Sequence, residues 1–370
     1  MNSELYRLNA ILAAADSGQP LSFDEVRTLL TLKEPESLRA LIDAAYAVKE
    51  RATGRKVFFR GLIEVSNICV KDCLYCGIRK SNRSVERYLM KEQEILAAAE
   101  FAFKSRYGSV VLQSGERSDS QFVDFIESVI RKIKLLSGGA LGITLSLGEQ
   151  SEETYGRWFA AGAHRYLLRI ETSNPELYKR LHPLDHNFEA RRDCLRRLKR
   201  RGYQVGTGVM IRLPFQTYDD LANDVLFFRD MDVDMIGMGP YLPSSNTPLA
   251  DEPASSFPIT EDPYKMAISM IAVTRIVLRD VNIAATTALQ ALKPYGREMG
   301  LKAGANIIMP NVTDVLYRPS YQLYDNKPCI DENADECSSC LESRIIDIDE
   351  EIGYGEWGDS RHFRAPAPKA

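Results

Sequence analysis

Short runs rich in β-branched and aromatic residues alternate with amphipathic stretches from about residue 55 to about residue 311. The strand candidates span residues 56–66, 109–113, 140–147, 164–171, 204–213, 234–241, 282–287 and 306–310. The helix candidates between them span residues 91–107, 121–136, 152–161, 188–201, 218–229, 264–279 and 294–303. Eight strands in alternation with helices are typical of one α/β fold, the complete (β/α)8 TIM-type barrel, in which helices enclose parallel strands.

The turn after the first strand candidate separates this barrel from its main alternative. A doubly wound open sheet that binds a dinucleotide carries a Gly-x-Gly-x-x-Gly turn at this point. The chain instead reads Ser66-Asn-Ile-Cys69, so the barrel is favoured. We expect an N-terminal helical extension at residues 1–54, the barrel at 55–311 and a C-terminal cysteine-bearing extension at 312–370. A capping box at Ser22–Glu25 opens one of the N-terminal helices.

Composition excludes several classes of partner. The 370 residues include 47 Lys and Arg against 51 Asp and Glu, so the formal net charge is -4 and no general basic field is available for nucleic acid. No apolar run approaches the roughly 20 residues that a membrane-spanning helix needs. The N-terminus lacks the basic-then-apolar pattern of a secretory signal. We therefore expect a cytoplasmic protein that has neither a nucleic-acid partner nor a membrane partner.

The seven cysteines fall into an uneven pattern. An odd number in a chain without an export signal argues against a disulfide framework and for metal or redox chemistry. Six of them form two triplets with the spacings C-x3-C-x2-C and C-x7-C-x2-C: Cys69, Cys73 and Cys76, then Cys329, Cys337 and Cys340. Cys194 stands alone on a helix candidate, where buried packing is the expected role.

The first triplet leaves the end of the first strand, which is where barrel enzymes place their chemistry. Three soft thiolates this close in sequence suit an iron–sulfur cluster or zinc. Structural zinc takes four ligands, and a nearby fourth is hard to find. His182 and His186 are separated by Pro183 and are predicted to lie in a surface loop. Three cysteines would leave one iron of a four-iron cluster open to a non-protein ligand, although zinc and unligated thiols remain alternatives.

This triplet, with the aromatic Tyr75 directly before its last cysteine, resembles the radical S-adenosylmethionine (SAM) superfamily. The resemblance implies that Cys69, Cys73 and Cys76 hold a [4Fe–4S] cluster and that SAM chelates the fourth iron. One electron, from a reductant such as ferredoxin or flavodoxin, would cleave SAM to methionine and a 5′-deoxyadenosyl radical. The protein would orient the cofactor and exclude water.

Residues 66–82 resemble the branch of that superfamily that contains biotin synthase, methylornithine synthase and the [FeFe]-hydrogenase maturase HydE. The HydE family fits best, and the resemblance covers about residues 50–345. Biotin synthase uses further cysteines on barrel strands, and the strand candidates here contain none. Methylornithine synthase gives no reason for the C-terminal triplet. The segments that support the HydE family are 112–116, 144–149, 166–172, 237–241, 285–288 and 321–324.

Strand alternation groups polar residues near the expected site. Thr144 and Ser146 lie two apart on the third strand candidate and share a face, as Arg169 and Glu171 do on the fourth. Glu171 suits a ribose hydroxyl or an amino group. A structural ion pair at the barrel mouth is the alternative for Arg169 and Glu171.

The resemblance assigns SAM binding to further residues. Arg191 would hold the SAM carboxylate as a charge-assisted fork, although beside Arg192 it otherwise indicates a solvated helix surface. Met210 would pack near the sulfonium. With Thr144, Ser146, Arg169 and Glu171, the remaining members of the set are Tyr75 and the turn that receives the SAM amino group: Gln113, Ser114, Gly115 and Glu116.

Four residues match positions that line the HydE cavity, where anionic groups bind: Arg60, Thr286, Thr287 and Tyr321. A buried arginine with two threonine hydroxyls makes an anion pocket, although β-propensity alone also explains the threonine pair. The resemblance implies a small organometallic or amino-acid-derived substrate, a cysteine-bound iron carbonyl–cyanide species delivered by the maturase HydG. The product would pass toward the scaffold GTPase HydF.

The second triplet is expected to hold an auxiliary iron–sulfur cluster, [2Fe–2S] or [4Fe–4S], with zinc as the main rival. By resemblance, such a cluster is present in only part of the family, so we expect it to lie outside the essential chemistry. A non-enzymatic alternative for the whole chain is an iron–sulfur or zinc carrier. Such a carrier would bind metal and never cleave SAM.

Overall fold

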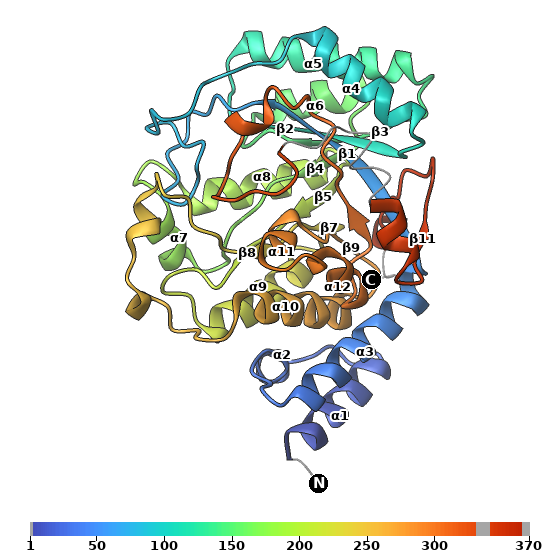
Figure 1. Cartoon of the computed structure of the whole chain (residues 1–370), viewed down its shortest axis with the longest axis vertical. Coiled ribbons are helices and arrows are strands. Elements are labelled where there is room, and N and C mark those ends of the chain that lie inside the picture. Colours follow the sequence, from blue (N-terminus) through green and yellow to red (C-terminus); the bar gives the residue numbers. More distant parts are fainter. Residues whose placement is uncertain (1–2, 331–340, 365–370) are drawn as a thin grey trace.

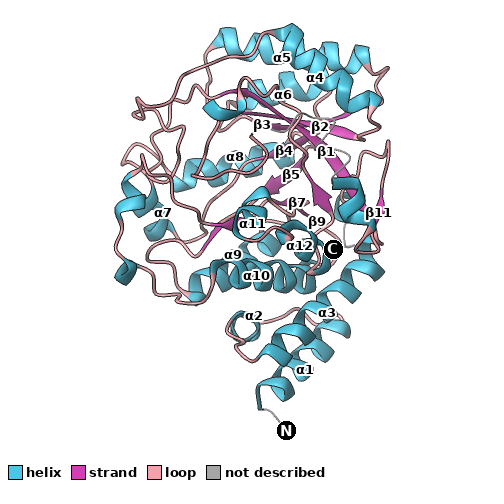
Figure 2. Ribbon diagram, viewed as in Figure 1, coloured by secondary structure: helices cyan, strands magenta, loops and turns pink. Residues whose placement is uncertain are grey.

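A sheet of parallel strands is the central feature of the computed structural model, which describes residues 3–330 and 341–364 (Figures 1 and 2). Eight strands follow one another in the order β10-β1-β2-β3-β4-β5-β7-β9, and β11 (Glu351–Ile352) adds to the outside of β1. The predicted strands are therefore confirmed. Their bounds are β1 Lys56–Ser66, β2 Ser109–Ser114, β3 Gly142–Ser146, β4 Arg165–Leu167, β5 Gln204–Thr207, β7 Met235–Ile236, β9 Asn282–Ile283 and β10 Ile307–Ile308.

The predicted fifth and sixth strands are each split in two. β6 (Met210–Ile211) follows β5, β8 (Gly239–Pro240) follows β7, and these two short strands pair with each other. At the break, the chain at Gly208 runs so close to Gly237 that a Cβ at residue 208 would lie 2.0 Å from the carbonyl oxygen of Gly237. Only a residue without a side chain allows this approach, and regular pairing stops here.

Helices cover the outer face of the sheet, as Figure 2 shows. The predicted helices are confirmed to within a few residues, because each carries apolar residues at helical spacing, as in α5, where Phe122, Ile126 and Ile133 are buried. The short helices α7 (Pro175–Leu181) and α11 (Thr287–Leu292) were not predicted. The others are α4 Glu92–Lys104, α5 Ser120–Leu136, α6 Glu152–Ala161, α8 Phe188–Arg200, α9 Tyr218–Asp230, α10 Pro263–Leu278 and α12 Gly296–Lys302.

Three helices precede the sheet: α1 (Ser3–Asp16), α2 (Phe23–Leu30) and α3 (Pro35–Thr53). The predicted capping box is present, since Ser22 and Glu25 exchange side-chain and backbone hydrogen bonds. α2 packs against α9 and α3 packs against α10, below the sheet in Figure 1. None of the helices within residues 3–330 and 341–364 combines the length and apolarity that crossing a membrane requires.

The two ends of the sheet are closed differently. The chain after residue 350 returns to the amino ends of the strands, where the Gly358 carbonyl oxygen accepts hydrogen bonds from Arg60 (3.0 Å) and Asn282 (2.8 Å). We call residues 351–360 the tail segment. The carboxyl ends of the strands carry the cysteine loop described below.

A buried carboxylate joins the loop after β4 to α9. The Ser173 backbone N–H donates to Asp224 Oδ1 at 2.6 Å. Asp224 is fully buried, and burial raises its pKa to about 7 despite the hydrogen bonds from Ser173. The folded protein therefore binds a proton here that the unfolded chain releases near its ordinary pKa of 3.8.

The variant Asp224→Asn is expected to gain stability over the parent as the pH rises. Between about pH 4 and pH 7, ionisation of the unfolded chain lowers the parent's stability by about 1.4 kcal/mol per pH unit, and asparagine does not titrate. Urea unfolding at pH 5, 6, 7 and 8 measures the difference. Asp193 is exposed, so Asp193→Asn serves as the control. Its stability difference from the parent should not change with pH. If the stability difference between Asp224→Asn and the parent were also independent of pH, the raised pKa assigned to Asp224 would be wrong.

Candidate active site

The loop after β1 carries the first cysteine triplet, and one arginine fixes its shape. The Arg87 guanidinium donates to four backbone carbonyl oxygens of this loop at 2.6–3.0 Å. Because these bonds satisfy carbonyls at both ends of the loop, Arg87 holds it in a single conformation. The sequence analysis missed this residue. The four carbonyls belong to Asn67, Ile78, Arg79 and Asn82.

The turn after β2 lies against the first cysteine. A Cβ at Gly115 would be 2.4 Å from the Ile68 carbonyl oxygen and 2.8 Å from Cys69 Cβ. The Glu116 backbone N–H donates to Cys69 Sγ at 3.3 Å, and the Glu116 carbonyl accepts from Val70 N–H at 2.9 Å. The requirement for glycine at residue 115 thus comes from the cysteine loop itself.

The three thiols of the loop share one partly enclosed region. Burial raises the pKa of Cys69 and Cys76, and raises that of Cys73 to about 12; the charge of neighbouring cysteines raises the pKa of Cys73 and Cys76 further. Among the described residues, no group of three or more His, Cys, Asp or Glu side chains is drawn together tightly enough to hold a single metal ion. A four-iron cluster that leaves one iron open to a non-protein ligand takes one thiolate on each of its other three irons. The donor set fits that demand, and binding would release the thiol protons.

Two histidines hold the cysteine loop from the side of α7. Both lie in the predicted loop, between α7 and α8, but their side chains do not face solvent, because His182 and His186 are 3% and 6% exposed. His186 Nε2 accepts from the Asp72 backbone N–H at 3.3 Å, and His182 Nε2 lies 3.2 Å from the Tyr75 hydroxyl. Burial lowers the pKa of His182 to about 3, so its ring is neutral, and Nδ1 donates to the Tyr178 carbonyl oxygen at 2.8 Å.

An apolar cluster lies beside Tyr75. Met210 is buried in this cluster, and the Tyr75 ring packs against it. Met210 was predicted to pack near the SAM sulfonium; its observed neighbour is the cluster that Tyr75 contacts. The other buried members are Leu177, Leu181, Leu213, Tyr241 and Leu249.

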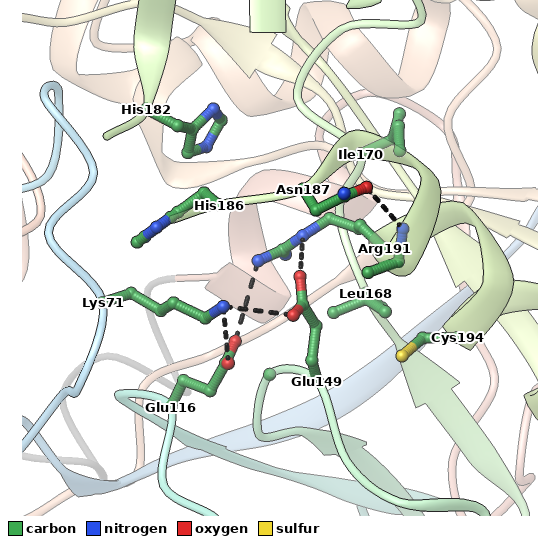
Figure 3. A network of polar contacts seen from close by, with 12 residues as sticks. Lys71, Glu116, Glu149, Leu168, Ile170, His182, His186, Asn187, Arg191 and Cys194 are labelled. Carbon is green, nitrogen blue, oxygen red and sulfur yellow. Dashed lines mark hydrogen bonds and ion pairs between the residues drawn. The ribbon is translucent and has the colours of Figure 1, made fainter. Parts of the chain in front are cut away.

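Four charged side chains form a closed ring next to the cysteines (Figure 3). Arg191 Nε lies 2.8 Å from Glu149 and its Nη2 3.6 Å from Glu116; Lys71 Nζ lies 3.1 Å from Glu149 and 3.4 Å from Glu116. Burial alone would raise the pKa of Glu149, but Arg191 and Lys71 together lower it. The ring ties the cysteine loop to the ends of β2 and β3 and to α8. The sequence analysis named Glu116 and Arg191 and missed Lys71 and Glu149.

Arg169 and Glu171 adjoin this ring. Arg169 Nη2 lies 3.0 Å from Glu171 Oε2, and the Arg169 carbonyl oxygen accepts from Arg191 Nη1 at 3.2 Å. Both residues follow β4 instead of lying on it, and Glu171 has a left-handed φ of 68°. Burial raises the pKa of Glu171. The expected ion pair is present, and it sits beside Arg191.

Residues 321–327 lie over the carboxyl ends of β1 and β2. The Tyr321 hydroxyl accepts from Gln113 Nε2 at 3.2 Å, and Lys327 forms an ion pair with Glu64. Burial raises the pKa of Tyr321 most, and the charge of Glu64 raises it too. The charges of Cys76 and Cys69 raise this pKa further. Tyr321 is therefore placed at the mouth, next to the cysteine loop.

Known proteins identify this arrangement. Residues 63–228 match the radical SAM superfamily. The [FeFe] hydrogenase maturase subunit HydE of Thermotoga maritima is 42% identical over 334 residues, which are 90% of this chain and 92% of that protein. The chain belongs to the HydE family of radical SAM enzymes. It is a radical SAM enzyme, and its superfamily implies a [4Fe–4S] cluster and SAM as cofactors.

More distant relatives share the fold of this HydE-family chain. The 3-methylornithine synthase of Methanosarcina barkeri is 27% identical over 299 residues, which are 79% of each protein. The crystal structure of a methylornithine synthase superposes with a TM-score of 0.79 at 24% identity, covering 93% of this chain and 98% of that one. The α/β architecture with an eight-stranded parallel sheet is thus that of the radical SAM barrels.

The four residues expected to line the cavity of this HydE-family chain are not joined to one another by any hydrogen bond or ion pair between described residues. Arg60 lies opposite Ser109, whereas Glu64 lies opposite Gln113. Arg60 is therefore about 13 Å below the mouth at roughly 3.3 Å per residue. Thr286 Oγ1 donates to the Met238 carbonyl oxygen at 3.3 Å, and Thr287 begins α11.

A cavity of about 20 Å³ lies in the interior below the mouth. Arg60, Thr144 and Asn282 line it together with apolar side chains. Thr144 accepts from Arg165 Nε at 2.9 Å, so it faces the floor of the sheet. Ser146 lies opposite Gln113, at the level of the mouth. Of the pair predicted to share a face, only Ser146 is at the depth of the cysteine loop.

The second cysteine triplet falls largely outside the described residues, since Cys337 and Cys340 belong to the segment 331–340. Cys329 is described and half-buried, with a left-handed φ of 63°. Its carbonyl oxygen accepts from Arg318 Nη1 at 3.1 Å. Cys194, by contrast, is 5% exposed on the buried face of α8, which confirms the packing role.

Proposed function

We propose that this radical SAM enzyme acts in hydrogenase maturation, in assembly of the active-site cluster of an [FeFe]-hydrogenase. The observation that carries the proposal is the 42% identity to a HydE maturase over nearly the whole of both chains, on a site whose three thiols have the donor set for an open-iron cluster. The methylornithine synthase relative is 27% identical over a shorter span. Bound together, the cluster and SAM supply a 5′-deoxyadenosyl radical.

The chain's own residues would position SAM. We assign the Nη2 edge of Arg191 to the SAM carboxylate, because Nε is already held by Glu149 and Nη1 by the Arg169 carbonyl oxygen. Nη2 faces Glu116 at 3.6 Å, longer than an ordinary hydrogen bond, and is available to a stronger acceptor. Tyr75 and Met210 would provide the apolar wall.

The turn after β2 and the residues next to it would complete the SAM site. Gln113, Ser114, Gly115 and Glu116 would receive the amino group, with Ser146 at the same depth as Gln113. Glu171, held by Arg169, would take the ribose or the amino group. Thr144, at the depth of the floor, would support Arg165 instead.

The substrate proposed for this site is a cysteine-bound iron carbonyl–cyanide species from HydG, whose product would pass to HydF. Tyr321, Thr286 and Thr287 would meet it near the mouth. Arg60 lines the small interior cavity. From there it would attract an anionic part of the substrate from below. Cys329, Cys337 and Cys340 would hold an auxiliary iron–sulfur cluster.

We further infer that the sheet closes into a complete barrel over residues 55–311, flanked by the extensions 1–54 and 312–370. The supporting observation is a pair of backbone hydrogen bonds between the segments of β10 and β9, which are the first and last strands in the sheet order. Asn306 N–H donates to the Ile283 carbonyl oxygen and Ala285 N–H to that of Ile307, both at 2.9 Å.

Two assays on one anaerobic preparation test the proposed function. After reconstitution with iron and sulfide, dithionite and SAM should yield 5′-deoxyadenosine. Added to a mixture of HydF, HydG and apo-hydrogenase that lacks HydE, the protein should restore hydrogen evolution. Cleavage of SAM without activation would favour a methylornithine synthase-like enzyme, and metal binding without cleavage would favour a carrier.

A further inference from the structure

The proposed cleavage of SAM consumes one electron, which must reach the cluster from outside the chain. With a net charge of -4, the protein as a whole does not attract an acidic electron carrier. A local surface next to the cysteines would have to do so. The face of the cysteine loop that points to solvent has the composition for this task.

Three segments meet at this face. The Lys80 backbone N–H donates to the Lys71 carbonyl oxygen at 2.8 Å, which joins residues 79–83 to the cysteine loop. The Leu74 N–H donates to the Leu181 carbonyl oxygen at 2.9 Å, which joins the loop to residues 181–186. These backbone contacts join the other two segments directly to the loop that carries Cys69 and Cys73.

Two apolar side chains on this surface are open to solvent. Val70, bonded directly to Cys69, is 53% exposed, and Leu184, between the two buried histidines, is 104% exposed. His182 and His186 are anchored below Leu184, so that its position is fixed by the same contacts that fix the cysteine loop. A rigid loop that presents a leucine to water beside a redox site is a candidate contact surface.

Positively charged residues concentrate in the segment that follows the cysteine loop in the sequence. Residues 79–91 contain five Lys or Arg and one Glu, in a chain that is acidic overall. Arg79 pairs with Asp72, and Arg87 is used by the loop carbonyls. Lys80 and Arg83 are exposed, and neither takes part in an ion pair with any residue in 3–330 or 341–364. Both are therefore available to an acidic partner. Asp185, which follows Leu184 in the sequence, is exposed and paired with His186.

We propose that Val70 and Leu184, with Lys80 and Arg83 at their rim, form the docking face for an acidic one-electron carrier protein of the flavodoxin or ferredoxin class. The proposal rests on the proposed function. A small apolar centre with a charged rim suits the weak, rapidly exchanging interfaces of electron-transfer partners. The carrier would lose one electron and the cluster would gain it, and no proton or group is transferred. The path is short because Val70 is bonded to a cluster cysteine.

The double variant Lys80→Glu/Arg83→Glu separates docking from chemistry. With reduced flavodoxin as donor at low ionic strength, stopped-flow bleaching of the oxidised cluster should slow by at least about tenfold, the scale of electrostatic steering. Salt at about 0.5 M should remove most of the difference between variant and parent. With dithionite, 5′-deoxyadenosine release should match the parent within about twofold. The matched control, Arg39→Glu/Lys265→Glu, reverses two exposed cations on α3 and α10 and should leave both donors unaffected.

A second variant, Leu184→Asp, alters a fully exposed side chain and should slow reduction by flavodoxin alone. The proposal is overturned if flavodoxin reduces the double variant as fast as the parent at low salt. It is also overturned if both donors lose activity equally, because docking would not affect dithionite. Failure of the proposed function is seen separately, as a parent whose cluster is reduced by either donor without cleaving SAM.

Discussion

Replacing Cys73 with alanine is expected to abolish release of 5′-deoxyadenosine from SAM while leaving the protein folded. Cys73 lies between the other two thiols of the loop, and its removal leaves two ligands where a four-iron cluster with one open iron needs three. Activity should fall to the uncatalysed background, a loss on the order of 10⁶-fold or more. The loop itself should persist, because Arg87, His182 and His186 hold it through other atoms.

Chromatography of the nucleoside product, with iron analysis of the same sample, measures this effect. Cys194→Ala is the matched control, since Cys194 is on the buried face of α8 with its Sγ 3.9 Å from the Gln150 carbonyl oxygen and belongs to neither triplet. It should keep its iron and its activity, and lose about 1 kcal/mol of stability at most. SAM cleavage by Cys73→Ala at the parent's rate would mean that the cluster is bound elsewhere.

The helices could be predicted because each shows helical periodicity over 10 or more residues, and the strands because short runs of β-branched and aromatic residues alternate with them. The cysteine motif could be predicted because its spacing is local. Lys71 and Glu149 could not, since they are 78 residues apart and lie in loops. Their contact exists only because parallel strands end at the same edge, where charges from different loops must pair to be buried. An isolated loop charge in a sequence gives no sign of such a partner.

Arg60 illustrates a second limit. The resemblance assigned it to a cavity, and it does line a small one, but neither the resemblance nor strand alternation gives the depth at which another segment arrives. Its neighbours come from the tail segment, nearly 300 residues later. The predictions for residues 312–370 did not include β11 or the return of the chain to the floor. His182 and His186 were misjudged for a related reason, since α7, which buries them, is too short to show periodicity.

The floor of the sheet depends on one carboxylate. Arg165 is fully buried, and its Nη1 lies 2.6 Å from Asp359 Oδ1 of the tail segment. Burial lowers the pKa of Arg165 to about 10, and burial together with the charge of Arg165 lowers that of Arg60. Burial opposes ionisation of Asp359 too, but its contacts with His164 and Arg165 hold its pKa below the ordinary value. Two buried cations thus share one counter-charge from the tail segment.

Asp359→Ala is therefore expected to destabilise the protein by about 3–5 kcal/mol, the cost of leaving a buried charge unpaired. Asp359→Asn keeps an acceptor for Arg165 and should cost less, and Asp359→Leu/Arg165→Met removes both charges and should recover much of the loss. Guanidinium unfolding of all three variants at pH 7 gives the free energies. If Asp359→Ala cost no more than Asp359→Asn, the two arginines would have to find their counter-charge elsewhere. The tail segment would then be a covering over the floor and not the element that neutralises it.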